Sequence, residues 1–158
     1  MDAEILRRTM WEEMLYADMR ANYFAELVRH YQNLDRSIRV CVLAASSGAA
    51  ATTLTAAPPE IKLGLPLVAA GGSFWLLFSQ YSMIARDAAD LHTGWNSIRT
   101  EYENLWNALA DPHAEARYHQ IYDRAEILSK AGTKFPNKKR RLRYWLEQAT
   151  KLARTRYA

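Results

Sequence analysis

Two long uncharged stretches constrain the fold of this chain most strongly. No Asp, Glu, Lys or Arg occurs in residues 40–59 or 63–85, and only residues 60–62 separate the two stretches. As an α-helix rising 1.5 Å per residue, the segment 38–57 would be about 30 Å long, which is the thickness of the hydrocarbon core of a bilayer. We therefore predict two membrane crossings, at about 38–57 and 63–85.

The connection between the predicted crossings begins with a helix-breaking pair, Pro58–Pro59. Because so few residues follow before the second stretch, the two helices are expected to form an antiparallel hairpin. The first crossing is rich in Ala, Ser, Thr and Gly and should insert weakly by itself, whereas the Leu, Phe and Trp residues of the second favour insertion.

Basic residues predict the orientation of this hairpin. The turn carries one basic residue, Lys62, whereas the segments before and after the crossings carry Arg29, Arg36, Arg39, Arg86 and Arg99. Basic segments stay on the cytoplasmic side of a membrane. We therefore expect both termini in the cytoplasm and the protein in the bacterial inner membrane.

The remaining sequence has the apolar periodicity of helices. Residues 2–36 contain neither Pro nor Gly, and their large apolar side chains recur at intervals of three, four and seven, the spacing of one face of an amphipathic helix. The period continues after residue 86, and further helices are expected at about 112–131, with Asp111 as its N-cap, and at about 136–156.

No alternating β pattern occurs in the chain, so we predict an all-α fold. More specifically, we predict a membrane protein with a long N-terminal amphipathic helix, a two-helix transmembrane hairpin and cytoplasmic C-terminal helices. The expected segments are 1–36 for the cytoplasmic amphipathic helix, 37–85 for the hairpin and 86–158 for the C-terminal region, whose basic tail is 134–158.

The basic tail is the most strongly charged segment. It contains nine Lys and Arg residues and one acidic residue, Glu147. Such a segment is attracted to anionic lipid headgroups, to a protein partner or to nucleic acid. We favour lipid or a protein partner over nucleic acid, because the predicted hairpin is close by. The candidate contact residues are Lys138, Lys139, Arg140, Arg141 and Arg143.

Small and hydroxyl-bearing residues recur along the first predicted crossing at helical spacing. Such residues let helices approach closely, and close packing drives helix association in lipid. One interpretation is packing within a single hairpin, against the small residues of the second crossing. The other is self-association around a pore with hydroxyl groups toward water. The candidate pore or oligomer-interface residues are Ala44, Ser46, Ser47, Gly48, Thr52, Thr53, Gly71 and Gly72.

The sequence offers no candidate for catalysis. The four histidines are scattered, and no metal-binding His pair, phosphate-binding glycine loop or nucleophile elbow occurs. The single cysteine, Cys41, excludes an internal disulfide. We therefore expect a protein that is not an enzyme, with no catalytic residue, metal or cofactor.

The layout as a whole resembles the SLATT family of two-transmembrane effectors associated with bacterial nucleotide-signalling systems. The resemblance extends from about Trp11 to the region of Gly132. It depends on ANYFAELVRHYQNLD at 21–35, the helix breaker APPE at 57–60 and SFWLLFSQYSMIARDAADLHTGWNSIRTEYENLW at 73–106.

The resemblance implies a pore-forming effector that oligomerises and permeabilises the inner membrane in anti-phage defence. It also implies a sensor, often a nucleotide-signalling enzyme or a reverse transcriptase. No fused sensor domain is predicted in this chain, so that partner would be a separate protein. Two alternatives stay open: a non-conducting, membrane-anchored helical adaptor for a partner enzyme, and a soluble helical bundle.

Overall fold

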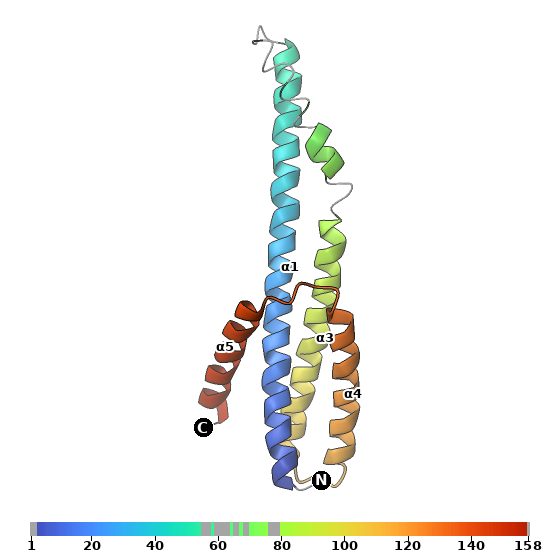
Figure 1. The fold of residues 1–158 in the computed structure, drawn as a ribbon, viewed down its shortest axis with the longest axis vertical. Helices are drawn as coiled ribbons and strands as arrows, with labels where there is room; N and C mark the ends of the chain where they lie inside the picture. Colours follow the sequence, from blue (N-terminus) through green and yellow to red (C-terminus); the bar gives the residue numbers. More distant parts are fainter. Residues whose placement is uncertain are drawn as a thin grey trace. The chain divides into compact units, whose positions relative to one another are not determined.

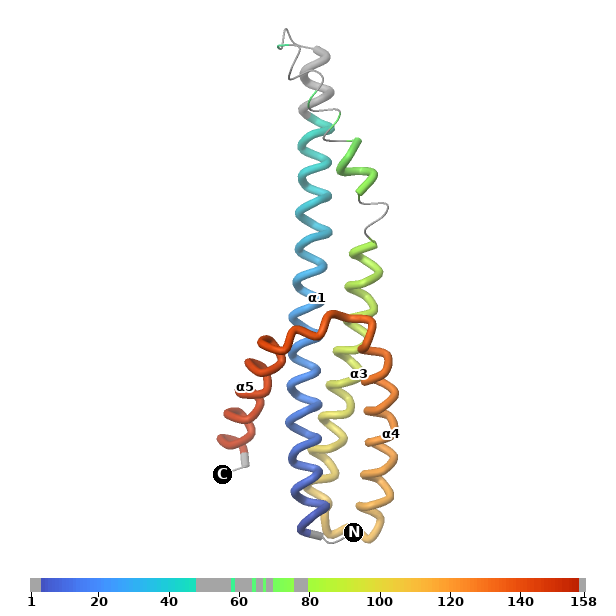
Figure 2. Tube along the Cα trace, viewed as in Figure 1, coloured from blue at the N-terminus to red at the C-terminus, as the bar shows by residue number. Residues whose placement is uncertain are grey.

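The structure is a computed structural model and describes residues 3–54, 58, 64, 67, 70–75 and 80–157; the side chains of residues 3, 48–54 and 157 lie outside the description. No strand occurs among the described residues, which confirms the predicted all-α class. Their long helices are α1 (Ala3–Leu54), α3 (Tyr81–Asn107), α4 (Ala114–Gly132) and α5 (Lys139–Tyr157), as Figures 1 and 2 show.

Helix α1 is one uninterrupted helix of 52 residues. It continues through Ser37, where the sequence predicts a change from an amphipathic helix to a membrane crossing. No Gly or Pro occurs before Gly48, so nothing in this part of the backbone interrupts the helical hydrogen bonds. The predicted boundary therefore marks a change of side chains and not a break in the helix.

The chain divides into two compact units. The first, which we call the helical bundle, joins Met1–Glu26 to Ala88–Ala158. The second, which we call the hairpin unit, is Leu27–Asp87. Both α1 and α3 contribute residues to both units.

The core of the helical bundle is formed by side chains at alternating intervals of three and four along α1, α3 and α4. This spacing places one apolar seam on each helix, as in a coiled coil. The buried residues of these seams are Met10, Met14, Ala17, Ala21 and Phe24 in α1, Leu91, Trp95, Ile98, Tyr102 and Leu105 in α3, and Tyr118, Ile121 and Ala125 in α4.

Close approaches and polar contacts align these helices. A Cβ atom on Gly94 of α3 would lie 2.9 Å from Cδ2 of Leu128 in α4, so a larger residue at position 94 would require the leucine side chain to shift. Between α1 and α3, Nδ1 of His92 lies 2.9 Å from the carbonyl oxygen of Ala21.

Helix α4 begins later than the sequence predicts. It starts at Ala114, and His113 is its N-cap, without a side-chain cap bond. Asp111 accepts a hydrogen bond from the backbone N–H of His113 at 2.9 Å, so the aspartate closes a turn just before the helix. The prediction of Asp111 as the N-cap was therefore wrong by two residues.

Gln80 separates α3 from the preceding helical residues. Its φ angle is 45°, in the left-handed region, where a side chain is strained and a right-handed helix cannot continue. Its carbonyl oxygen accepts bonds from the N–H groups of Met83 and Ile84 at 2.9 and 3.1 Å, which opens α3. The predicted second crossing at 63–85 is therefore interrupted at Gln80.

Glu13 is a half-buried acidic residue on α1, close to the buried ring of Tyr102. Burial, and secondarily the negative charge of Glu12, raise the pKa of the Glu13 carboxyl above its ordinary value of 4.5. Below pH 4.5 the carboxyl is mostly neutral in both the folded and the unfolded chain. Above the raised pKa the charged form opposes folding.

A Glu13→Gln variant is therefore expected to be more stable than the natural chain at pH 7, by less than about 1 kcal/mol because the carboxylate keeps part of its hydration. The difference should disappear below pH 4, where both side chains are neutral. Thermal unfolding at the two pH values measures it. Glu12→Gln is the matched control, since Glu12 is exposed and pairs with Arg8 at 3.3 Å. An equal gain in both variants at pH 7 would contradict the prediction.

Candidate membrane-facing surface and basic helix

In the hairpin unit, α1 runs antiparallel to the residues that contact it from the segment 70–75 and from the start of α3. Near one end Tyr31 of α1 stacks on Tyr81 of α3, with ring centroids 6.2 Å apart. Farther along α1, Val42 lies against Gly72 in the helical segment 70–75. As residue numbers rise along α1 from 31 to 42, those of the contacted residues fall from 81 to 72. Of the predicted turn at 58–62, residues 59–62 lie outside the described residues.

Gly72 permits the closest of these contacts. A Cβ atom at this position would lie 2.6 Å from Cγ2 of Val42, which is closer than two carbon atoms can pack. A Cβ atom on the neighbouring Gly71 would meet nothing within 4 Å. Of these two candidate interface glycines, Gly72 therefore packs within the hairpin, whereas Gly71 is exposed.

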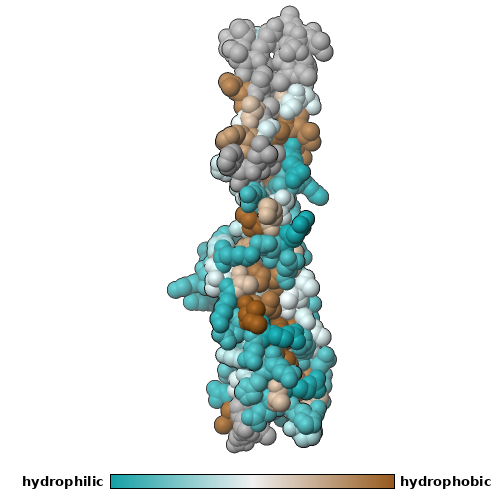
Figure 3. Space-filling view, turned by 90° about the vertical axis from the view of Figure 1, so that its right-hand side faces the viewer, coloured by the Kyte–Doolittle hydropathy of each residue, from teal (hydrophilic) through white to brown (hydrophobic). Residues whose placement is uncertain are grey.

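Large apolar side chains are exposed among the described residues of the hairpin unit. The ion pair between Arg39 and Asp35, 2.8 Å long, precedes this region on α1, and no charged residue occurs from there to the end of α1. In Figure 3, apolar brown side chains appear on this unit. We define the hairpin surface as Val40, Leu43, Leu67, Phe74, Trp75 and Met83, whose exposed fractions are 57–71%.

The other small candidate residues lie beside this surface. Ala44, Ser46 and Ser47 are all exposed, whereas the intervening Ala45 is buried. The hydroxyl of Ser46 donates a hydrogen bond to the carbonyl oxygen of Val42 at 2.8 Å. It is therefore satisfied by its own helix and needs no water. The side chains of Gly48, Thr52 and Thr53, which complete the candidate set, lie outside the described residues.

The basic tail forms α5 and the segment before it. Phe135 is buried against Phe24 of α1 with ring centroids 5.6 Å apart, and the hydroxyl of Tyr23 donates to the carbonyl oxygen of Pro136. The connection between α4 and α5 is thus attached to α1 within the helical bundle.

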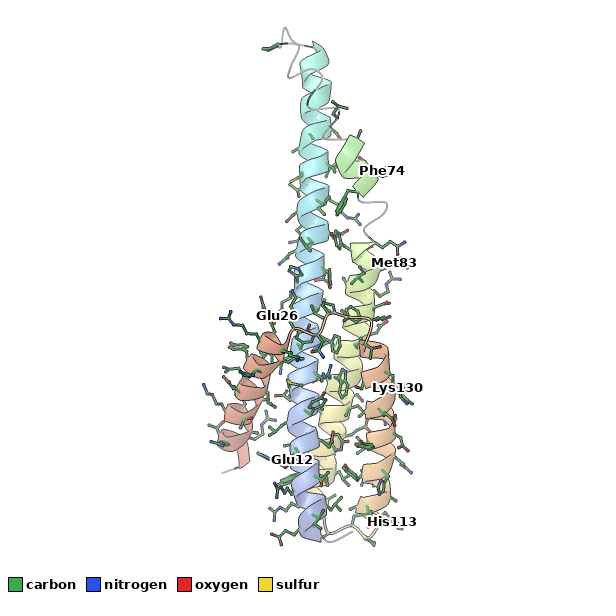
Figure 4. All side chains as sticks on the ribbon, viewed as in Figure 1. Glu12, Glu26, Phe74, Met83, His113 and Lys130 are labelled. Carbon is green, nitrogen blue, oxygen red and sulfur yellow. The ribbon has the colours of Figure 1, made fainter. Side chains whose placement is uncertain are left out.

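Glu26 of α1 holds the first turns of α5. One carboxylate oxygen pairs with Arg141, and the other accepts a hydrogen bond from Nε1 of Trp145 at 2.9 Å. Figure 4 labels Glu26 beside the start of α5. Near the other end of α5, Arg156 pairs with Glu103 of α3 at 2.7 Å.

The candidate basic residues thus have different surroundings. Arg141 pairs with Glu26 of the bundle although it is exposed, whereas Lys138, Lys139, Arg140 and Arg143 are exposed without an ion pair to the described residues. Sequence reasoning did not find Glu26 and Glu103 as partners of α5. Each lies more than fifty residues along the chain from its partner in α5, and each is one of many acidic residues on amphipathic helices.

The described residues contain no helix that combines the length and apolar content needed to cross a bilayer. Parts of the predicted crossings at 38–57 and 63–85, namely 55–57, 63, 65–66, 68–69 and 76–79, lie outside those residues. In the same described part of the chain, no three His, Cys, Asp or Glu side chains form a group that could hold a metal ion.

In comparisons with known proteins, no family model, no curated protein and no solved structure matches the chain.

Proposed function

We propose that this chain is a membrane effector whose hairpin unit inserts into the bacterial inner membrane, self-associates and permeabilises that membrane in anti-phage defence. The hairpin surface carries the proposal. Its large apolar side chains are exposed in water, within an uncharged part of the chain. An exposed apolar surface of this kind marks a region that lipid or another protein covers.

Two further features of α1 support insertion and self-association. The hydroxyl of Ser46 is bonded to its own helix, as serine hydroxyls commonly are in membrane helices. Val40, Leu43, Ala44 and Ser47 are all exposed and follow one another at helical spacing, so they share one face of α1. A face that combines small and apolar residues suits contact with a second copy in lipid.

The resemblance to the SLATT layout supports the defence role. On that basis both termini lie in the cytoplasm, and a separate sensor protein triggers the effector. A non-conducting membrane anchor for a partner enzyme is the second candidate. It is favoured by the packing of Gly72 against Val42, since this small residue is used within one hairpin and not between copies.

The test begins with expression of the full chain in bacteria, followed by fractionation and alkaline extraction of the membranes. We expect the chain to stay in the extracted membranes. A Leu43→Asp variant should be recovered there at least severalfold less, because an acidic side chain within a bilayer is strongly disfavoured. Ile127→Asp is the matched control, since Leu43 and Ile127 have the same exposed fraction of 66% but Ile127 lies on α4 of the helical bundle.

Membrane potential, followed in the same cells with a voltage-sensitive dye, separates the two candidates. Depolarisation by the natural chain that is lost in Leu43→Asp supports the effector. A chain that remains in the extracted membranes at high expression without depolarising them, even with infecting phage present, supports the anchor. Recovery of the natural chain in the soluble fraction without detergent would contradict both.

A further inference from the structure

Helix α5 makes a small apolar contact with the rest of the helical bundle. Among its described side chains, the buried ones are Ala149 and Ala153, which are both small. Leu146 and Leu152 are larger apolar side chains of the same helix, and both are exposed. The apolar face of α5 is thus only partly covered by its own chain.

A cavity of about 150 Å³ lies between α5 and the helices beneath it. Its lining includes Leu15 and Asp18 of α1, Glu103 of α3, and Ala149 and Ala153 of α5. Side chains that face an open cavity lose the dispersion contacts that a filled core would provide. The docking of α5 also depends less on packing than that of α4, because the buried side chains of α4 include the larger Tyr118 and Ile121.

Ionic contacts hold α5 at both ends. Arg141 and Trp145 bind Glu26, and Arg156 binds Glu103. The side chains of Arg141 and Arg156 remain 57% and 60% exposed. Ion pairs this exposed are screened by water and salt and contribute little to stability. Arg141 and Arg156 can therefore leave Glu26 and Glu103 and bind another anionic surface instead.

The exposed residues of α5 include both cations and apolar side chains. Apart from Arg141 and Arg156, the exposed cations of this segment form no ion pair within the described part of the chain; they are Lys138, just before the helix, and Lys139, Arg140, Arg143, Lys151 and Arg154. Tyr144, Leu146 and Leu152 are exposed among them. A helix with this composition, cationic on one side, apolar on the other and polar on average, is typical of segments that lie in the plane of a membrane interface.

From these observations we infer that α5 binds the anionic headgroups of a lipid bilayer, in exchange with its docked position on Glu26 and Glu103. The inference rests on the proposed membrane location of the chain. Lipid suits this helix better than nucleic acid does. Leu146 and Leu152 would be buried from water at the boundary of the acyl chains, whereas a phosphate backbone offers them no apolar contact. The apolar side of α5 then faces the bilayer, and the cations lie at the level of the lipid phosphates.

Quenching of tryptophan fluorescence by brominated acyl chains tests this contact. The full chain is reconstituted into vesicles of brominated phosphatidylcholine alone, or with brominated phosphatidylglycerol. The difference between the natural chain and Trp145→Phe isolates the contribution of α5, and the difference from Trp75→Phe isolates that of the hairpin surface. We expect Trp145-dependent quenching only in the anionic vesicles, and Trp75-dependent quenching in both.

Charge variants test the exchange of α5 between its docked position and the lipid surface, with Trp145-dependent quenching as the readout. Arg140→Gln with Arg143→Gln should shift the equilibrium of α5 toward its docked position by roughly thirtyfold, from the attraction of two basic residues to an anionic surface. Glu26→Gln should shift it the other way, because Arg141 loses its partner. The matched control is Lys130→Gln with Arg117→Gln. It removes two exposed cations from α4 and should leave the equilibrium of α5 unchanged.

The possible failures are distinguishable. Absence of Trp145-dependent quenching in anionic vesicles, with Trp75 still quenched, would overturn the inference and leave the proposed function standing. Absence of Trp75-dependent quenching would overturn the proposed function. Tight binding of an RNA oligonucleotide by this face, without Trp145-dependent quenching, would assign the face to nucleic acid and overturn the lipid contact.

Discussion

Replacing Tyr102 by alanine is expected to lower the free energy of unfolding of the helical bundle by about 3–5 kcal/mol, the range for loss of a buried aromatic ring. Tyr102 is among the largest fully buried side chains and lies in the α3 seam, beside Tyr118 of α4 with ring centroids 6.1 Å apart. Its removal leaves a cavity that the flanking helices cannot close without moving. Urea unfolding of the full chain in mild detergent measures the change.

A second substitution at the same position separates the ring from its hydroxyl. The hydroxyl of Tyr102 is buried and has no hydrogen-bond partner among the described residues, and burial is the main cause that raises its pKa above the ordinary value. Tyr102→Phe is therefore expected to be neutral or stabilising by about 1 kcal/mol, since it removes a buried, unsatisfied polar group. Equal losses for Tyr102→Ala and Tyr102→Phe would show that the hydroxyl, and not the packing of the ring, matters at this position.

A Gly72→Leu variant is expected to lower depolarisation at least tenfold under the proposed function. The Cβ atom alone would lie 2.6 Å from Cγ2 of Val42, and a β-branched valine has little rotamer freedom to give way. Leucine adds further carbons, so the two helical segments must separate at a cost of about 3 kcal/mol, the upper part of the range for overpacking. The voltage-dye assay measures the loss, with equal amounts of each variant in the membrane.

The neighbouring glycine and a compensating change provide the controls. Gly71→Leu meets nothing within 4 Å of its Cβ atom in the hairpin, so a loss of depolarisation there would point to a contact between copies. Gly72→Ala combined with Val42→Ala should recover the activity that Gly72→Ala alone loses, since the second change removes the clashing methyl group. Full activity of Gly72→Leu would contradict the role of close packing within the hairpin.

Periodicity in the sequence accounts for much of the helical bundle. Intervals of three and four were sufficient to predict that Met10, Leu91, Trp95, Ile98 and Tyr102 share helix faces, and all five are buried. An apolar side chain at such a spacing falls on one side of an α-helix whatever the helix packs against. The all-α class follows from the same local pattern.

Helix boundaries could be predicted less well, because competing local interactions differ little in energy. Pro112 suggested that α4 begins at once, yet the turn closed by Asp111 delays its start to Ala114. Nothing in the apolar stretch around Gln80 signals that this residue adopts a left-handed conformation. Glutamine has no intrinsic preference for that region, so the local sequence does not predict the conformation.

By itself, the sequence determined which faces of the helices are apolar, where the charge-free stretches lie and that the tail is basic, because each is a property of neighbouring residues. Only the tertiary structure decided that Gly72 and not Gly71 faces Val42, and that Glu26 holds Arg141 and Trp145. These contacts join residues tens of positions apart. Their geometry depends on the rotation and register of the helices. A shift of one residue rotates a side chain by about 100° around its helix, and the local sequence does not predict such a shift.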